Sequence, residues 1–183
     1  MDWKTLESKY VYHDRWLKAR ADKCELPDGR IMEPYYVIEV PNWTNMVIIT
    51  KDERIVLVRQ FRQAFGATTL ELPGGILEKG ETPKASAIRE MQEETGYVSD
   101  EVEFLMQISP NPALNNNTAY FFLAKNAEKL LHTSFDAFED LKIETYSKEE
   151  FKQLLIEGKL QHGVQQGAIY QALIKLKWLN WEF

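Results

Sequence analysis

Within residues 75–96, Arg89 and four of the glutamates, Glu81, Glu90, Glu93 and Glu94, stand at fixed spacings, with a glycine at each end of the segment. Glu90 and Glu94 are four positions apart, so on a helix they lie one turn apart on the same face, and Glu93 joins that face. Unneutralised like charges at this spacing disfavour a helix by about 0.2–0.5 kcal/mol per pair. The spacing therefore indicates a loop that leads into a helix, with an acidic face that holds divalent cations.

Local signals place both ends of this helix. Thr82 can cap the first turn, Pro83 suits the first helical position, and Gly96 suits the position just past the last turn. The sequence therefore predicts a helix between Thr82 and Gly96. Four residues recur at helical spacing and are predicted to face the core: Ala85, Ile88, Met91 and Thr95.

The residue types around the acidic face suit metal chemistry. Carboxylate oxygens are suitable ligands for Mg²⁺ or Mn²⁺, with water and substrate phosphate filling the remaining positions. Arg89 is four positions before Glu93 and can pair with it, which would orient that carboxylate. Gly74 and Gly75 allow a tight turn that leaves a main-chain carbonyl able to point at the metal. The alternative is an acidic helix face that is simply solvated.

The rest of the chain alternates between strand and helix patterns. A capping box at Ser147 and Glu150 starts a second helix that ends at Gly158, and a last helix covers about residues 164–178. Mixed strands with helices on both sides indicate an α/β fold, an α/β/α sandwich. Predicted strands cover residues 12–24, 31–40, 46–50, 55–61, 69–72, 103–108, 119–124 and 141–146.

Length and composition limit the possible classes. The 183 residues suit one domain with a small appendage, here an N-terminal antiparallel β-meander over residues 1–42 and a larger domain over residues 43–183. The net charge of −6 argues against binding to a nucleic-acid backbone. Cys24 is the only cysteine, which excludes an intrachain disulfide. With no signal peptide and no apolar run of membrane-spanning length, we expect a cytoplasmic protein that does not bind membranes.

The acidic pattern has a known counterpart. Its full form is Gly75-x5-Glu81-x7-Arg89-Glu90-x2-Glu93-Glu94-x-Gly96, followed by Tyr97 where an aliphatic residue is more usual. This spacing resembles that of the Nudix hydrolases, which cleave phosphoric anhydrides and have an α/β/α sandwich fold. The resemblance implies more than one Mg²⁺ ion per site, held by Glu90 and Glu94, with the carbonyl of Gly74 or Gly75 and with Glu93 or a further glutamate. Glu81 would support the cluster or act as an outer ligand.

Features outside this pattern resemble the branch of the family that hydrolyses ADP-ribose and other nucleoside diphosphate sugars. They are residues 58–62 leading to residues 70–75, prolines at 110 and 112, and an acidic stretch, residues 134–140, before a strand and a Ser-Lys-Glu-Glu helix. In that branch a loop glutamate is the catalytic base or an extra metal ligand. Glu139 is the best match and Asp136 the second, while Glu93 is a candidate base within the pattern. The alternative is a solvated surface loop.

The same resemblance implies substrate contacts. Arg62 would contact a substrate phosphate, and its alternative role is a surface cation at a strand end. Gly75 and the loop with Pro110 and Asn115 would also contact substrate, although this loop reads Asn-Asn-Asn where the branch often carries a glutamate. Aromatic rings of the meander would stack on the base, and the alternative is that they fill the meander core or a dimer interface. The best matches are Trp16 and Tyr35, with Tyr36 next and Trp43 last.

Taken together, the sequence predicts a Mg²⁺-dependent Nudix pyrophosphatase. Its expected substrate is a nucleoside diphosphate sugar, with ADP-ribose giving AMP and ribose 5-phosphate, and the expected assembly is a homodimer formed through the meander. One alternative is a pyrophosphatase for nucleoside triphosphates or dinucleoside polyphosphates. Another is a sensor that binds ADP-ribose-like ligands without turnover; such domains usually lose acidic residues that this chain keeps.

Overall fold

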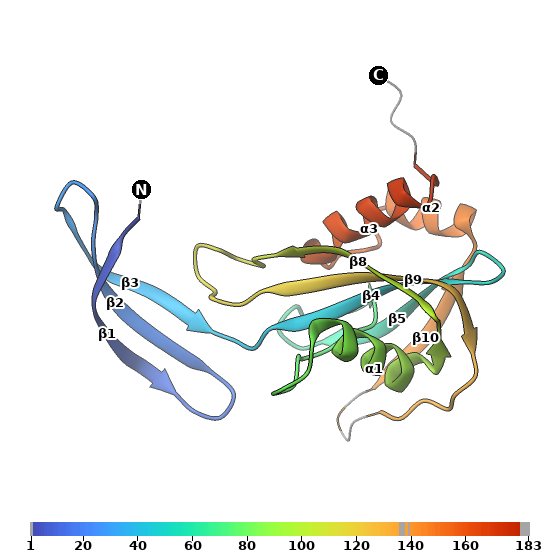
Figure 1. Cartoon of the computed structure of the whole chain (residues 1–183), viewed down its shortest axis with the longest axis horizontal. Coiled ribbons are helices and arrows are strands. Elements are labelled where there is room, and N and C mark those ends of the chain that lie inside the picture. Colours follow the sequence, from blue (N-terminus) through green and yellow to red (C-terminus); the bar gives the residue numbers. More distant parts are fainter. Residues whose placement is uncertain (1, 136–137, 139, 180–183) are drawn as a thin grey trace. The chain divides into compact units, whose positions relative to one another are not determined.

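The computed structural model describes residues 2–135, 138 and 140–179. It divides into two units, shown in Figure 1. The first unit comprises Met1–Asn42 and Ile108–Ala119, and the second comprises Trp43–Gln107 and Tyr120–Phe183. No helix among the described residues is long and apolar enough to cross a membrane.

The first unit is a three-stranded antiparallel sheet with β2 (Lys18–Glu25) between β1 (Lys4–His13) and β3 (Ile31–Glu39). The predicted strand over residues 12–24 is wrong, because a turn separates β1 from β2. In this turn Asp14 Oδ1 accepts the main-chain N–H groups of Trp16 and Leu17, both at 2.7 Å. An aspartate side chain that captures nearby N–H groups in this way competes with strand pairing.

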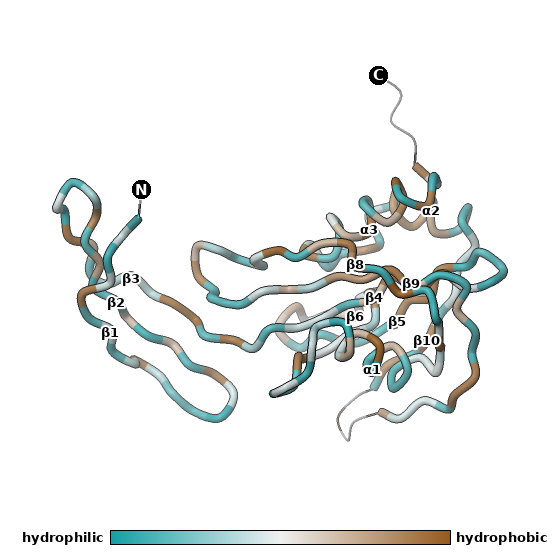
Figure 2. The backbone as a smooth tube through the Cα atoms, in the orientation of Figure 1, coloured by the Kyte–Doolittle hydropathy of each residue, from teal (hydrophilic) through white to brown (hydrophobic). Residues whose placement is uncertain are grey.

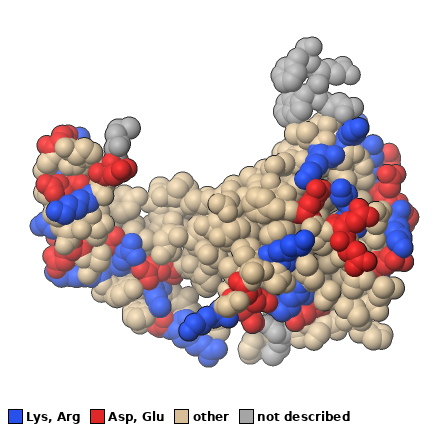
Figure 3. All heavy atoms as spheres, viewed as in Figure 1, with Lys and Arg blue, Asp and Glu red and all other residues tan. Residues whose placement is uncertain are grey.

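Side chains in the first unit are mostly exposed. No residue of β1 is buried, and Asp22 and Cys24 are the buried residues of β2. Figure 2 shows mainly hydrophilic residues along β1 and β2, and Figure 3 shows acidic and basic side chains mixed over the visible face of this unit. The loop after β8 joins the unit through β3, where Ile38 N–H donates to Leu114 O at 2.8 Å.

The second unit contains a seven-stranded sheet with the order β10-β5-β4-β9-β7, in which β6 also pairs with β5 and β8 with β9. Neighbours β4 and β9 run in the same direction, whereas β4 and β5 are antiparallel, so the sheet is mixed (Figure 1). Its strands are β4 (Trp43–Thr50), β5 (Ile55–Arg62), β6 (Ala67–Glu71), β7 (Tyr97–Val98), β8 (Glu101–Ile108), β9 (Ala119–Lys129) and β10 (Leu141–Tyr146).

Three helices cover this sheet. Helix α1 (Pro83–Thr95) lies on one side, and α2 (Lys148–Ile156) and α3 (Gly163–Lys175) lie on the other (Figure 1). This arrangement confirms the predicted α/β/α sandwich and the small N-terminal antiparallel sheet. Helix α3 ends earlier than predicted, while the capping box at the start of α2 is present with both of its hydrogen bonds.

Helix α1 has the predicted ends. Thr82 Oγ1 accepts the N–H of Ala85 at 3.2 Å, and Gly96 has a left-handed φ of 72°. The predicted core-facing set is partly wrong, because Ala85 is exposed and Ala87 is buried instead, beside Met91. The buried face is therefore turned toward the side that carries Glu90 and Glu94, which places both carboxylates at the edge of the core.

Candidate active site

A polar cavity of about 490 Å³ lies beside the acidic face of α1. It is bordered by the C-terminal part of β5, by the glycine loop that follows β6, and by α1 itself. The cavity contains most of the predicted catalytic and metal-binding residues. Its full lining is Gln60, Arg62, Gly74, Gly75, Ile76, Glu78, Arg89, Glu90, Glu93, Glu94 and Ser134. All of these lining residues except Ser134 thus lie within residues 60–94.

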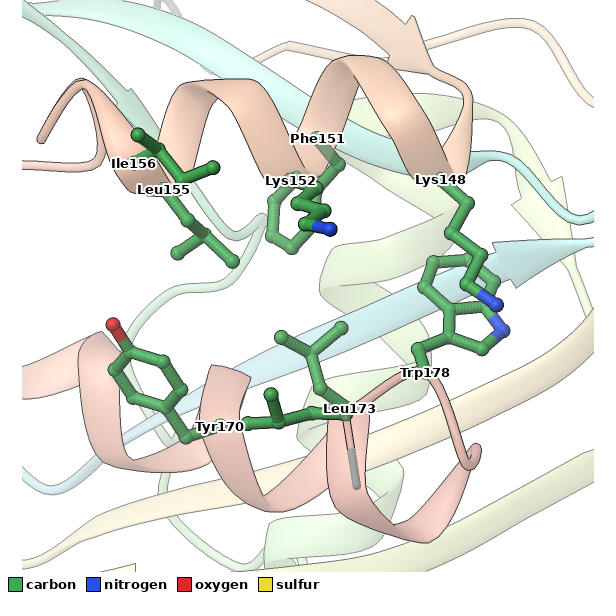
Figure 4. A pocket seen from close by; sticks show the side chains of 9 residues that line it. Lys148, Phe151, Lys152, Leu155, Ile156, Tyr170, Leu173 and Trp178 are labelled. Atoms are coloured by element: carbon green, nitrogen blue, oxygen red, sulfur yellow. The ribbon is translucent and has the colours of Figure 1, made fainter. Parts of the chain in front are cut away.

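A second cavity, of about 320 Å³, has a different character. It lies between α2 and α3, where Phe151 and Leu155 face Leu173 and Tyr170 (Figure 4). The ammonium group of Lys148 lies 5.7 Å from the centroid of the Trp178 ring at one end of it. Its described lining contains no carboxylate, so it offers no oxygen ligands from side-chain acids. The polar cavity is therefore the candidate active site.

Two carboxylates of the polar cavity are buried. Glu90 is 8% exposed and Glu94 is 5% exposed. Glu94 Oε2 accepts the main-chain N–H of Gly74 at 2.8 Å, and Glu90 Oε1 accepts Arg89 Nη1 at 2.8 Å. Burying a charge is costly unless the charge is paired or coordinates a metal. Two buried carboxylates on one helix face therefore indicate that nearby positive or hydrogen-bonding groups offset their negative charge.

Arg89 is the centre of the compensation. Its Nε donates to Glu81 Oε1 at 2.9 Å, and its Nη1 donates to Glu93 Oε2 at 2.9 Å as well as to Glu90. These contacts raise the pKa of Arg89, with Glu81 making the largest contribution, and Arg89 in turn lowers the pKa of Glu81. The guanidinium thus collects three carboxylates around one cation and orients them along the cavity wall.

The glycine loop is packed against this cluster from both sides. Gly74 has a φ of 153°, which L-residues rarely adopt, and a Cβ there would lie 2.0 Å from the carbonyl oxygen of Thr44. A Cβ on Gly75 would lie 2.4 Å from Glu90 Oε1. The Gly75 carbonyl accepts the N–H of Thr44 at 2.9 Å, so the Gly74 carbonyl is the better candidate for a metal ligand.

The donor set fits a divalent cation that is shared with substrate. Among the described residues, no group of three acidic, histidine or cysteine side chains converges on a metal position in this conformation. The reason is that Glu81, Glu90 and Glu93 converge on Arg89 instead. Mg²⁺ usually takes one or two protein carboxylates and fills its octahedron with water and phosphate oxygens. Glu90, Glu94 and a glycine carbonyl meet that requirement.

Arg62 reaches the cavity from β5 and is already paired. Its Nε and Nη2 donate to the two oxygens of Glu71 at 2.9 and 2.7 Å. Burial raises the pKa of Glu71, but the hydrogen bonds from Arg62 and Thr69 outweigh it, so the net pKa is lowered. Arg62 is therefore not a free surface cation, and it is held at the cavity wall by a buried anion.

The other predicted substrate residues lie in the first unit. Trp16 is 78% exposed in the β1–β2 turn, with the Arg15 guanidinium 4.5 Å from its ring centroid. The hydroxyl of Tyr35 donates to the carbonyl of Ala113 at 2.9 Å, in the loop that also holds Pro110 and Asn115. Their role in binding substrate stays a prediction. Trp43 instead packs edge-on against Phe121 and His162 in the second unit.

The predicted loop carboxylates, Glu139 and Asp136, lie outside the described residues. The stretch that carries them begins close to α1, because Ser134 N–H donates to the carbonyl of Glu93 at 2.8 Å and Ser134 lines the cavity. The roles of Glu139, Asp136 and Glu93 as candidate bases therefore stay predictions.

Sequence reasoning assigned no role to Gln60, Ile76, Glu78 or Glu71. Gln60 is two residues before Arg62 on β5, so alternation along a strand could have placed both on the cavity side. Glu71 stands between Leu70 and Leu72, and a charged residue flanked by two apolar residues indicates burial with a partner.

Two family models match consecutive parts of the chain. The nucleoside diphosphate sugar hydrolase N-terminal domain matches residues 3–38, and the NUDIX domain matches residues 42–163. A crystal structure of an ADP compounds hydrolase has a TM-score of 0.85 over 97% of this chain and 95% of that chain. At 19% identity, this likeness shows a shared fold.

Curated relatives give the same classification. The methanol dehydrogenase activator of Bacillus methanolicus is 32% identical over 69% of this chain and 68% of its own length. An ADP-ribose pyrophosphatase of Bacillus subtilis (strain 168) is 28% identical over 71% of this chain and 70% of its own length. The mouse ADP-sugar pyrophosphatase is 43% identical, but over 37% of this chain and 31% of its own length. The NUDIX domain model matches more than half of the residues of this chain, which therefore belongs to the Nudix hydrolase family.

Proposed function

We propose that the protein hydrolyses the diphosphate bond of nucleoside diphosphate sugars, with ADP-ribose as the leading substrate, to a nucleoside monophosphate and a sugar phosphate. The observation that carries this proposal is the polar cavity with Glu90 and Glu94 buried on one face of α1. The match of residues 3–38 to the N-terminal domain of nucleoside diphosphate sugar hydrolases supports this substrate class. Relatives named ADP-ribose pyrophosphatase and ADP-sugar pyrophosphatase support it as well.

Mg²⁺ is the proposed metal, with Mn²⁺ as a substitute and more than one ion per site. Glu90, Glu94 and the Gly74 carbonyl would hold it, with Glu93 or Glu139 completing the set. When bound, the ions supply Lewis-acid polarisation of the diphosphate. Arg62 would orient a substrate phosphate through its planar guanidinium, which suits phosphate oxygens. Glu93 or Glu139 would accept the proton of the attacking water.

Arg89 would act on this step by holding its neighbours. Its Nη1 donates to Glu93 Oε2 at 2.9 Å. This contact restrains the carboxylate of Glu93, a candidate base, although 44% of that side chain is exposed. Arg89 also contacts Glu90 in the buried part of the site. Since general-base catalysis requires the base within hydrogen-bond reach of the water, this restraint would favour a productive geometry.

The first unit would provide recognition of the nucleoside and the contact between two copies. Trp16 and Tyr35 would stack on the base, and the loop with Pro110 and Asn115 would contact the sugar. Exposed apolar residues along β1, such as Leu6 and Val11, support a homodimer in which this unit is partly covered.

A substrate panel tests the proposal. Purified protein would be incubated with Mg²⁺ and ADP-ribose, other nucleoside diphosphate sugars, dinucleoside polyphosphates and nucleoside triphosphates, and the products separated by chromatography. AMP and ribose 5-phosphate that disappear on chelation and return on adding Mg²⁺ are the expected result. Turnover of nucleoside triphosphates alone would contradict the substrate class and retain the Nudix chemistry. Saturable ADP-ribose binding without turnover would favour a sensor.

A further inference from the structure

We propose that Glu71 is a positioning residue, which fixes the Arg62 guanidinium so that its remaining N–H groups are presented to the substrate phosphate. This inference deepens the proposed function and rests on the phosphate contact of Arg62. Glu71 does not line the polar cavity, and it has no predicted role in metal binding or proton transfer.

The pair is built by two neighbouring strands. Arg62 ends β5 and Glu71 ends β6, and the two strands pair in antiparallel register, with Val58 opposite Glu71 and Ala67 opposite Arg62. Both hydrogen bonds of the pair are short, at 2.9 and 2.7 Å. This bidentate geometry fixes both the position and the plane of the guanidinium.

The two partners differ in their exposure. Glu71 is 2% exposed, whereas the Arg62 side chain is 47% exposed and lines the polar cavity. An exposed ion pair contributes little, but a buried carboxylate left without its cation is strongly destabilising. Glu71 therefore acts as a fixed anchor, and Arg62 is the partner whose other edge is available to a ligand.

The chemistry of arginine explains why pairing with Glu71 leaves part of the Arg62 guanidinium able to bind a phosphate. A guanidinium has five N–H donors in one plane. Glu71 engages the Nε–H and one Nη2–H, so the remaining donors, on Nη1 and Nη2, point away from the carboxylate. A phosphate in the cavity can use these donors without breaking the existing pair.

Further groups hold the anchor itself. The Thr69 hydroxyl donates to Glu71 Oε1, and the same hydroxyl contacts the Gln60 carbonyl at 3.3 Å. His162 faces the pair from the start of α3, and burial lowers the pKa of its ring, against the opposing effect of Glu71. Glu71 is thus an ionised, fully engaged side chain, which is the condition for orienting a cation.

The chain offers a matched control on the same strand. Arg59 of β5 forms an equally bidentate pair with Glu144 of β10, at 2.9 and 2.8 Å. Glu144 is also bonded to Tyr146, and neither Arg59 nor Glu144 lines the polar cavity. Replacing Glu144 by glutamine therefore breaks a similar pair of the same sheet without touching the Arg62 edge.

The test compares Glu71→Gln with Glu144→Gln in steady-state kinetics with ADP-ribose and Mg²⁺. For Glu71→Gln we expect KM to rise about tenfold, the effect of losing about 1.4 kcal/mol of binding, with a smaller change in kcat. Glu144→Gln should leave KM within about twofold of the wild type. Since Glu71 is buried, Thr69→Val is a gentler second variant, expected to raise KM in the same direction by less.

A double-mutant cycle separates positioning from a general loss of structure. If Glu71 acts through Arg62, adding Glu71→Gln to Arg62→Ala should raise KM little further, because the anchored group is already gone. Fully additive effects, or an equal rise of KM in Glu71→Gln and Glu144→Gln, would overturn the inference. Thermal midpoints of all variants would show whether each one folds.

A binding measurement keeps the inference separate from the choice of substrate. Calorimetry with AMP requires no turnover, and we expect about tenfold weaker binding in Glu71→Gln than in the wild type. If the panel shows a different diphosphate substrate, the proposed substrate fails, and the same KM comparison on that substrate decides the role of Glu71. Equal AMP affinity in Glu71→Gln and wild type would overturn the positioning role. If the wild type does not bind AMP, the same comparison is made with the monophosphate product of the substrate that the panel identifies, and equal affinity for it would overturn the role as well.

Discussion

Every residue of β1 is exposed in the first unit, whereas β4 in the second unit is buried at all but its first residue. The second unit therefore has a core that can hold catalytic groups at fixed positions, since close-packed interiors transmit and resist strain. The first unit instead presents apolar side chains to its surroundings: Leu6, Tyr10, Val11, Tyr12, Ile31 and Met32 are among them. Burial drives folding at about 25 cal/mol per Å², so these side chains favour contact with a ligand or a second copy.

The largest expected effect is the loss of catalysis in the second unit. Glu94→Gln removes the negative charge of a buried, proposed metal ligand, and we expect kcat to fall by about a thousandfold, equal to about 4 kcal/mol of transition-state stabilisation. Initial rates with ADP-ribose and Mg²⁺ measure it. The control is Glu7→Gln on the exposed strand β1, which should leave the rate unchanged. Comparable losses in both variants would remove the functional contrast between the two units.

Core truncation should separate the two units by stability. Met46 is 0% exposed, and Met46→Ala should lower the free energy of unfolding by about 2–5 kcal/mol. Leu6→Ala on β1 should change the monomer's stability by about 0.5 kcal/mol or less. Denaturant unfolding monitored by circular dichroism compares them. A Leu6→Ala effect as large as that of Met46→Ala, at a dilution at which the protein is monomeric, would mean that the first unit has a buried core.

Self-association should depend on the first unit. Replacing Leu6, Tyr10 and Val11 together by serine removes apolar area from β1, and we expect the dimer dissociation constant to rise about tenfold or more. Sedimentation at several concentrations measures it. The matched control is Ile156→Ser, an exposed apolar residue of the second unit, which should leave the dimer intact. A monomeric wild type would contradict the homodimer directly.

The smallest expected effect concerns acid stability. Hydrogen bonds from Arg59 lower the pKa of Glu144 from 4.5 to about 2. A carboxyl with a depressed folded-state pKa stabilises the fold above its unfolded value, and this contribution is lost as the pH falls through the folded value. Stability should therefore decline from about pH 4.5 toward pH 2. Urea midpoints against pH should show a shallower decline in Glu144→Gln, and an unchanged slope would contradict this.

Local signals made parts of the fold predictable. Thr82, Gly96 and the Ser147 capping box act on their own neighbours, so the ends of α1 and the start of α2 agree with the sequence. The turn after β1 was missed because Asp14 takes main-chain donors that strand pairing would otherwise use. The direction of the α1 face was misjudged because Ala87, and not Ala85, packs against the sheet.

The candidate site was predictable where its residues lie on one helix, and less so elsewhere. Glu90 and Glu94 follow from a single spacing along α1. The anchoring of Arg62 by Glu71 depends on the pairing of β5 with β6, which no local pattern specifies. The three-way contact of Arg89 likewise requires the loop with Glu81 to return to the helix.

A screen of random variants would distinguish Gly74 from Gly75. At Gly74 an added side chain meets the main-chain carbonyl of Thr44, and no side-chain rearrangement can move that obstacle aside. At Gly75 the obstacle is the end of the Glu90 side chain, which can swing away. Selection for expression alone would thus tolerate alanine at 75 and reject it at 74, whereas selection for turnover would reject both. Gly74 is therefore required for the loop to fold, whereas Gly75 leaves room for the carboxylate of the proposed metal ligand Glu90.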